Sequence, residues 1–345
     1  MSKTIQKNSG YKKYVVSPKL QYFKTHATKI EKTFAEELSS SLNSDLKFIN
    51  PKFFYDKKGS NLFEKICTLP EYYPTRTEIT ILKQLQDELA SYLDGNFRLV
   101  ELGSGTSVKT RLILDILSKL QDNTEYFPID ISEILTESSE QLLKDYDDLH
   151  ITGIIDTYEG GLEFLKNFDD KKNLIIFLGS SFGNFSPNAG YKFLQKINSM
   201  MKSDDLFLIG LDLVKDKLIL ESAYNDSQGV TAEFNLNILS RINDELDADF
   251  HLKDFSHRAI YNVKEQRIEM YLKSLVNQSV MISKSDLVLN LKKDELILTE
   301  HSHKYRLSQI NELLEHAGFE IKHTWLDDNK HFSLTLASKR SDLCT

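Results

Sequence analysis

Cysteine, proline and tryptophan are all scarce in this chain of 345 residues, which has two cysteines, six prolines and one tryptophan. Cys67 and Cys344 lie far apart and form no ligand pattern, so we expect neither a disulfide framework nor a thiolate metal site. The chain also has no run of the ~20 apolar residues that a membrane-spanning helix requires. Its first residues, Met1 to Thr4, carry no apolar signal core. We therefore expect a cytoplasmic protein with no membrane partner.

Positive charge is not in excess either. Lysine and arginine total 43 against 51 aspartates and glutamates, which gives a formal net charge of −8. Proteins that bind nucleic acids carry basic surfaces, so this balance disfavours a nucleic-acid partner. Hydrophobic residues make up 40% of the chain, enough for a proper buried core, and the length fits one large or two ordinary domains.

Strand and helix patterns alternate regularly through the middle of the chain. Apolar runs predict strands at 99–102, 125–129, 151–155, 174–178 and 206–211. The segments between them predict helices at 107–120, 132–144, around 162–165 and at 187–201. This alternation is typical of right-handed crossovers and a parallel sheet covered on both faces. The predicted fold class is therefore α/β, with a Rossmann-like sheet.

The regular alternation of strand and helix patterns ends after residue 213. Helical patterns at 216–224 and 230–246 precede strand patterns at 260–263, 268–275, 278–283 and 295–299, which predicts an additional α+β lobe. A helix at 308–316 and a hairpin of strands 320–325 and 331–337 should complete the first sheet. We expect the substrate-binding lobe to combine residues 1–76 and 214–304, and the core to combine 77–213 and 305–345. Within the first part, we expect a loose polar arm over about the first twenty residues and a helix at 77–93.

A glycine turn follows the first strand of the core. Glu101 is followed by Gly103 and Gly105, and Asp130 ends the next predicted strand, where a carboxylate can accept ribose hydroxyls. The third glycine of a dinucleotide fingerprint is replaced by Val108, so this shorter acidic form resembles the first motif of S-adenosylmethionine-dependent methyltransferases. A dinucleotide loop and a purely structural turn remain alternatives.

Longer segments narrow the resemblance to one family. Residues 54–63, 69–76, 178–184, 212–216, 223–235 and 267–270, with Glu300, Ser302, Lys304 and Tyr305, resemble the histidine-specific Nα-methyltransferases of the ergothioneine pathway. The similarity runs from about Phe53 to the C-terminus and includes both lobes. Fungal N-methyltransferases of a prenylated tryptophan share much of this pattern, so the family alone leaves the substrate open.

The resemblance implies roles for individual residues. The positions implied for S-adenosylmethionine are Tyr72, Gly103, Gly105, Lys109, Asp130 and Asp156. Asp130 would hold the ribose and Asp156 would lie beside the adenine, although Thr157 departs from the usual aromatic residue there. The positions implied for the amino acid's carboxylate and α-amino group are Tyr55, Asn184 and Tyr224, which we take as the catalytic set. Those implied around the imidazole are Met270, Glu300 and Ser302.

The residue types suit this chemistry. A glutamate accepts a hydrogen bond from an imidazole N–H and favours the protonated ring, whereas a carboxylate facing a neutral indole is costly. Each residue also has a plainer interpretation. Glu300 and Ser302 could form a solvated strand face, Asn184 could cap the following helix, and Lys109 could be solvated. His301 and His303 could bind a metal, but no third ligand is evident, so we expect no metal site.

The resulting hypothesis is a monomeric enzyme that uses S-adenosylmethionine to methylate the α-amine of L-histidine, a small-molecule substrate, as far as the trimethylated betaine. Three rivals remain: an N-methyltransferase for another amino acid or an indole alkaloid, a non-catalytic S-adenosylmethionine sensor, and a nucleic-acid methyltransferase.

Overall fold

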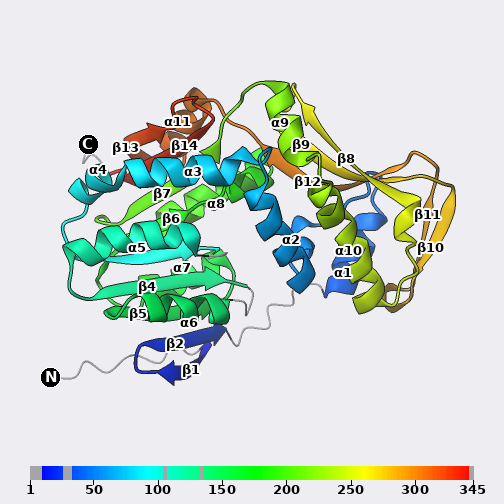
Figure 1. The fold of residues 1–345 in the computed structure, drawn as a ribbon. Helices are drawn as coiled ribbons and strands as arrows, with labels where there is room; N and C mark the ends of the chain where they lie inside the picture. Colours follow the sequence, from blue (N-terminus) through cyan, green and yellow to red (C-terminus); the bar gives the residue numbers. More distant parts are fainter. Residues whose placement is uncertain (1–9, 26–32, 104–106, 132–134, 342–345) are drawn as a thin grey trace.

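A computed structural model describes residues 10–25, 33–103, 107–131 and 135–341 of the chain. Two lobes lie side by side, one built on a large sheet with helices on both faces and the other on smaller sheets backed by helices (Figure 1). Among these residues, no helix combines the length and the apolar character needed to cross a membrane.

A nine-stranded sheet forms the first lobe, in the order β1-β2-β5-β4-β3-β6-β7-β14-β13. Its parallel centre consists of the five predicted strands: β3 (Phe97–Leu102), β4 (Thr124–Asp130), β5 (Leu149–Ile155), β6 (Lys172–Phe177) and β7 (Leu206–Asp212). Strand order reverses at β3, which has β4 on one side and β6 on the other. Open α/β sheets bind ligands beyond the carboxyl ends of their strands at such a reversal. The α/β prediction is confirmed.

The predicted C-terminal hairpin closes this sheet. Strands β13 (Phe319–Leu326) and β14 (Phe332–Lys339) pair with each other, and β14 lies antiparallel to β7, with Phe332 opposite Asp212. The core sheet is therefore completed by strands that follow the second lobe in the sequence.

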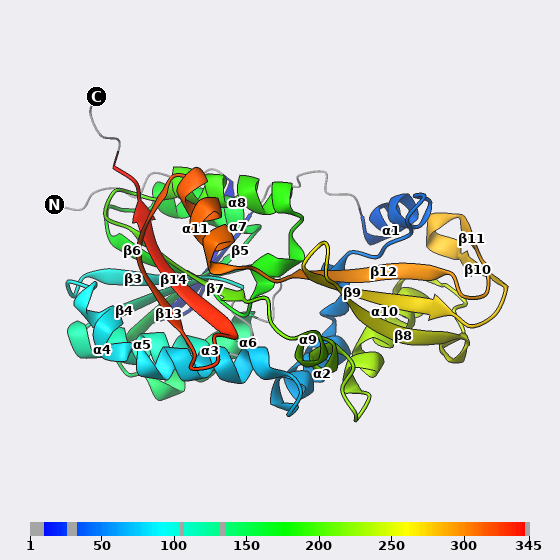
Figure 2. The same ribbon diagram turned by 90° about the horizontal axis from the view of Figure 1, so that it is seen from above.

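Helices cover both faces of the sheet, as Figure 2 shows from above. One apolar cluster joins the sheet to α3 (Tyr73–Gln84), α4 (Gln86–Ser91), α5 (Val108–Leu120) and α6 (Leu135–Asp145). A second cluster joins the opposite face to α7 (Tyr158–Lys166), α8 (Pro187–Met200) and α11 (Leu307–His316). The helix expected at 77–93 starts four residues earlier than predicted, at Tyr73, and is divided into α3 and α4 at Leu85.

The expectation of a loose N-terminal arm is wrong for residues 11–25. They form a hairpin of β1 (Tyr11–Ser17) and β2 (Leu20–Thr25), and β2 pairs in parallel with β5. Leu20 and Tyr22 are buried, whereas most of β1 is exposed, as expected of an edge strand. These residues extend the core sheet, although we expected 1–76 to belong to the other lobe.

The second lobe has the expected α+β character. An antiparallel sheet of β8 (Phe255–Asn262), β9 (Arg267–Ser274) and β12 (Leu296–His303) runs in the order β12-β9-β8. A separate hairpin pairs β10 (Gln278–Ile282) with β11 (Leu287–Leu291), a strand that we did not predict. The helices of this lobe are α1 (Phe34–Leu42), α2 (Lys57–Thr68), α9 (Lys217–Tyr224) and α10 (Val230–Leu246).

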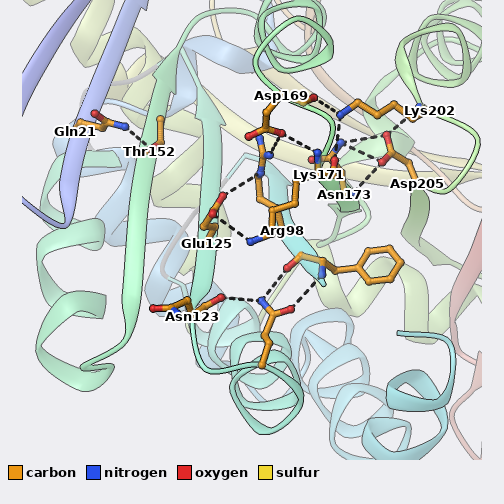
Figure 3. Close-up of polar contacts among 12 residues, drawn as sticks. Gln21, Arg98, Asn123, Glu125, Thr152, Asp169, Lys171, Asn173, Lys202 and Asp205 are labelled. Carbon is orange, nitrogen blue, oxygen red and sulfur yellow. Dashed lines mark hydrogen bonds and ion pairs between the residues drawn. The ribbon is translucent and has the colours of Figure 1, made fainter. Parts of the chain in front are cut away.

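A polar network ties together the amino ends of the core strands (Figure 3). Arg98 is fully buried, forms ion pairs with Asp169 and Glu125, and stacks over Phe127 at 4.4 Å. Asp205 accepts the Asn173 backbone N–H at 2.7 Å. This edge is the opposite one from the glycine turn, so its charges serve the fold and leave the carboxyl edge for a ligand.

Candidate active site

A cavity lies where the carboxyl edge of the sheet meets the second lobe. Its wall includes every position expected to contact substrate, namely Tyr55, Asn184, Tyr224, Met270, Glu300 and Ser302. Tyr72, expected near the cofactor, also lines it, together with Gly179, Ser180, Asp212 and Phe234. Residues separated by more than two hundred positions in the sequence thus share one cavity.

A tight turn sets the position of Tyr55. The residue lies between a 3₁₀-helix (Pro51–Phe54) and α2, whose first turn is capped by the Asp56 carboxylate on the Gly59 N–H at 2.6 Å. A Cβ on Gly59 would lie 1.7 Å from the Phe54 carbonyl oxygen, so this approach requires glycine. The Tyr55 ring packs edge-on against Phe63 at 5.7 Å between centroids.

Aromatic rings make up much of the cavity wall. Tyr55 and Phe63 each lie 6.0 Å from Phe234, and Tyr72 lies 6.1 Å from Tyr224. Aromatic faces attract cations through their quadrupole, most strongly where water is excluded. The wall is therefore suited to a cationic reactant or product.

Asn184 ends a 3₁₀-helix (Ser181–Asn184) in the loop after β6 and faces the cavity. The cap of the following helix α8 is Ser186, whose hydroxyl accepts the Ala189 N–H at 3.3 Å. The capping interpretation of Asn184 is therefore wrong. The loop is held against β12, since the His303 Nδ1 lies 2.9 Å from the Gly183 carbonyl oxygen.

Glu300 presents a carboxylate to the cavity from β12. The strand has an irregularity between Leu298 and Glu300, after which Glu300 pairs with Met270 of β9. Burial raises the pKa of Glu300 to about 7, although the nearby Lys304 charge opposes this shift. No hydrogen bond between this carboxylate and another residue of the described parts of the chain is found, so its oxygens can accept from a ligand.

Behind the cavity lies a buried network that we did not predict. Lys304 forms an ion pair with Asp212 at 2.8 Å, and neither side chain is exposed. Lys304 also donates to the Tyr224 hydroxyl at 3.1 Å and to the Ser302 hydroxyl at 2.9 Å. Tyr73 donates to Asp212 from the other side at 2.7 Å. The signal available in the sequence was an aspartate ending an otherwise apolar strand, β7.

The glycine turn has the backbone that the sequence predicts at Gly103. Its φ is +78°, and its N–H donates to the Ile129 carbonyl at 3.0 Å. A Cβ there would lie 2.8 Å from the Tyr158 hydroxyl, so Tyr158, which we did not predict, covers the turn. Gly105 lies outside the described residues.

Acidic residues surround this turn. Asp130 is the last residue of β4, and Asp156 follows β5, with its backbone N–H donating to the Asp130 carbonyl at 3.1 Å. Glu101 is buried and accepts from Thr110 at 2.7 Å and from Tyr126 at 2.6 Å. Burial raises the pKa of Glu101 to about 7 despite these hydrogen bonds.

Asp156 and Lys109 each have a partner within the protein. Asp156 accepts a hydrogen bond from Tyr11 of the N-terminal hairpin, and from the Thr157 N–H at 2.7 Å. Lys109 forms an ion pair at 2.8 Å with Glu78 of α3, so it is not simply solvated.

The rings of His301 and His303 lie 6.0 Å apart. In the described parts of the chain, no cluster of three or more histidine, cysteine, aspartate or glutamate residues is arranged to hold a metal.

Comparison with known proteins identifies the family. A sequence model described as "Histidine-specific methyltransferase, SAM-dependent" matches residues 34–339. The chain belongs to this family. It is therefore an S-adenosylmethionine-dependent methyltransferase.

The relatives carry different names. The histidine N-alpha-methyltransferase of Mycobacterium tuberculosis is 39% identical over 304 residues, which cover 88% of this chain and 94% of that protein. Ergothioneine biosynthesis protein 1 of Neurospora crassa is 30% identical over 83% of this chain, but over only 32% of its own length. The 4-dimethylallyltryptophan N-methyltransferase of Claviceps purpurea is 27% identical over 62% of this chain and 64% of that protein.

The residues of this methyltransferase fit its cofactor. Carboxylates lie at the carboxyl ends of β4 and β5, where a nucleoside's polar groups are expected. The Ser107 hydroxyl is buried at the same turn and has no partner among the described residues. A polar ligand at the turn would satisfy this hydroxyl, because buried polar groups are rarely left unpaired.

Proposed function

We propose that this methyltransferase transfers methyl groups to the α-amino group of L-histidine, in succession to the trimethylated betaine, hercynine, as the first step of ergothioneine biosynthesis. The observation that carries this proposal is the Glu300 carboxylate in the same cavity as Tyr55, Asn184 and Tyr224. A carboxylate suits an imidazole N–H, and the other three side chains supply polar groups for an amino acid's carboxylate and amine. The names of the relatives support the same substrate and pathway.

The chain's own residues would bind and orient the amino acid. S-adenosylmethionine supplies the electrophilic methyl group when it is bound. We assign its binding to Tyr72, Gly103, Gly105, Lys109, Asp130 and Asp156. Methyl transfer demands mainly that the reacting groups be held in line, so positioning by Tyr55 and Asn184 is the main contribution we expect from the protein. The aromatic wall tolerates the fixed positive charge of the product.

We further propose that the functional unit is a cytoplasmic monomer with two lobes. Its substrate lobe combines the residues after the N-terminal hairpin up to residue 76 with residues 214–304. Its core combines residues 77–213 and 305–345, to which we now add the hairpin of residues 11–25, since β2 pairs with β5. The placement of the cavity between these parts supports this division.

The test is turnover of an amino-acid panel that includes histidine, tryptophan and 4-dimethylallyltryptophan. Each compound is incubated with the protein and S-adenosylmethionine, and products are analysed by mass spectrometry. We expect masses increased by one, two and three methyl groups for histidine, with S-adenosylhomocysteine released in step. Turnover of only the tryptophan derivative would favour the indole substrate instead. Cofactor binding by calorimetry without release of S-adenosylhomocysteine would indicate a sensor.

A further inference from the structure

The fully buried Lys304 lies directly behind Ser302 and Tyr224, two residues of the cavity wall. The Lys304 ammonium group has three acceptors: Asp212 at 2.8 Å, Ser302 at 2.9 Å and Tyr224 at 3.1 Å. An ammonium group has three N–H donors and no acceptor. Each of its protons therefore has one partner, and both hydroxyl oxygens must accept from Lys304.

The two hydroxyl groups are also bonded to each other. Tyr224 donates to the Ser302 oxygen at 2.9 Å. A serine oxygen has two lone pairs, and here one accepts from Lys304 and the other from Tyr224. Ser302 can therefore offer a ligand only its own proton.

Asp212 keeps the Lys304 side chain protonated. Burial alone would lower the pKa of Lys304, but the adjacent Asp212 carboxylate outweighs burial and raises it above the ordinary value. Asp212 is itself surrounded by donors, since Lys215 and Tyr73 also bond to it. The charge of Lys304 is thus fixed by the fold.

Ser302 lies two residues from Glu300 on β12, and both line the cavity. Alternate residues of a strand share one face, so one planar ring can reach both side chains. Glu300 offers an acceptor and Ser302 a donor. A neutral imidazole has one N–H and one bare nitrogen, which matches this pair, whereas an imidazolium would direct a second N–H at an oxygen with no free lone pair.

We propose that Lys304, held by Asp212, is a positioning residue that makes Ser302 a donor toward the cavity, so that the site binds the neutral imidazole ring. One ring nitrogen donates to Glu300 and the other accepts from Ser302. This inference rests on the proposed function. It reverses our expectation that Glu300 selects the protonated ring.

The first test compares histidine with its 1,2,4-triazole analogue, whose ring stays neutral near pH 7. If the neutral ring binds, kcat/KM for the analogue should stay within about tenfold of the histidine value. A loss of a hundredfold or more would show that the site requires a protonated ring and would overturn the inference.

The second test removes the donor. Ser302→Ala should raise the KM for histidine about five- to tenfold, as expected for the loss of one hydrogen bond, with a smaller change in kcat. Ser302→Thr keeps a hydroxyl and should restore most of the affinity. Ser274→Ala is the matched control, because Ser274 is equally buried on the adjacent strand but lies outside the cavity lining. A KM unchanged in Ser302→Ala would refute the inference.

The third test addresses Lys304 itself. Lys304→Met removes the donor to Ser302 and leaves Asp212 paired with Lys215 and Tyr73, so no buried charge loses its last partner. We expect this variant to raise the KM for histidine as Ser302→Ala does, while calorimetry shows cofactor affinity within twofold of wild type. Equal losses of cofactor and histidine binding would indicate a merely structural role. If wild-type protein methylates no histidine, the proposed function fails; if it does but these variants behave like wild type, only this inference fails.

Discussion

Replacing Glu78 by alanine should destabilise the core and loosen the cofactor side of the site together. Glu78 is fully buried on α3. Both of its carboxylate oxygens lie 3.0 Å from the Gly179 backbone nitrogen, in the loop after β6, and one lies 2.8 Å from the Lys109 ammonium group. One side chain thus ties a helix, the β6 loop and the first turn of α5 together.

The expected loss of unfolding free energy depends on which polar groups each substitution leaves unpaired. Breaking a buried ion pair typically costs about 3–5 kcal/mol, because the remaining charge is stranded. The Lys109 side chain is 24% exposed and can turn toward water, so we expect about 3 kcal/mol for Glu78→Ala. Glu78→Gln keeps an oxygen for the Gly179 N–H and loses only the charge, so we expect about 1–2 kcal/mol.

Urea unfolding without cofactor measures these losses, and calorimetry of S-adenosylmethionine binding measures their effect on the site. Glu64→Ala is the control, since Glu64 is an exposed glutamate on the neighbouring helix α2. We expect Glu78→Ala to weaken cofactor binding at least tenfold and Glu64→Ala to change neither quantity. If Glu78→Ala were as stable as the control, the reasoning from burial and pairing would be refuted.

Three further changes test other parts of the structure. Tyr11→Phe removes the hydrogen bond to Asp156 and should weaken cofactor binding by calorimetry about three- to tenfold, with a change in unfolding free energy under about 1 kcal/mol; unchanged affinity would contradict a role for the hairpin. Gly103→Ala should cost about 1–2 kcal/mol of backbone strain at φ +78° and weaken cofactor binding at least tenfold, and adding Tyr158→Phe should recover part of the binding. Burial lowers the pKa of His301 from 6.5 to about 4, so the unfolded chain binds more protons between these values and stability should fall as the pH drops from 6.5 to 4. His301→Gln should make that fall shallower in urea unfolding measured across this range, and an unaltered slope would exclude His301 as its source.

The core of the fold follows from local patterns in the sequence. Residues 174–177 of β6 and 206–211 of β7 carry no polar side chain because both faces of these strands are covered. Helix periodicity identifies α5, α8 and α10 closely. The N-terminal hairpin has no such pattern. Most of β1 faces solvent, and the hairpin is held by pairing with β5, a tertiary contact that no local pattern encodes.

The residues of the site also fall into a group that the sequence predicted and a group that it did not. The six positions expected to contact substrate came from a resemblance across distant segments, because no spacing within one segment links Tyr55 to Glu300. Asp212 and Lys304 lie in segments that carried this resemblance, yet they received no role. A lysine is normally solvated. Lys304 is buried against Asp212 because the chain after β12 pairs with the end of β7 through Leu213 and Tyr305, a tertiary contact that the sequence does not show.

The central claim is that the Glu300 carboxylate holds the imidazole of histidine while its amine is methylated. The most direct measurement is kcat/KM for histidine in Glu300→Ala, with Glu312→Ala, an exposed position on α11, as control. A hydrogen bond to a charged group contributes about 1.5–3 kcal/mol, which predicts a loss of roughly 10- to 150-fold, with cofactor affinity unchanged. Histidine turnover equal to that of wild type and of the Glu312 variant would contradict the account.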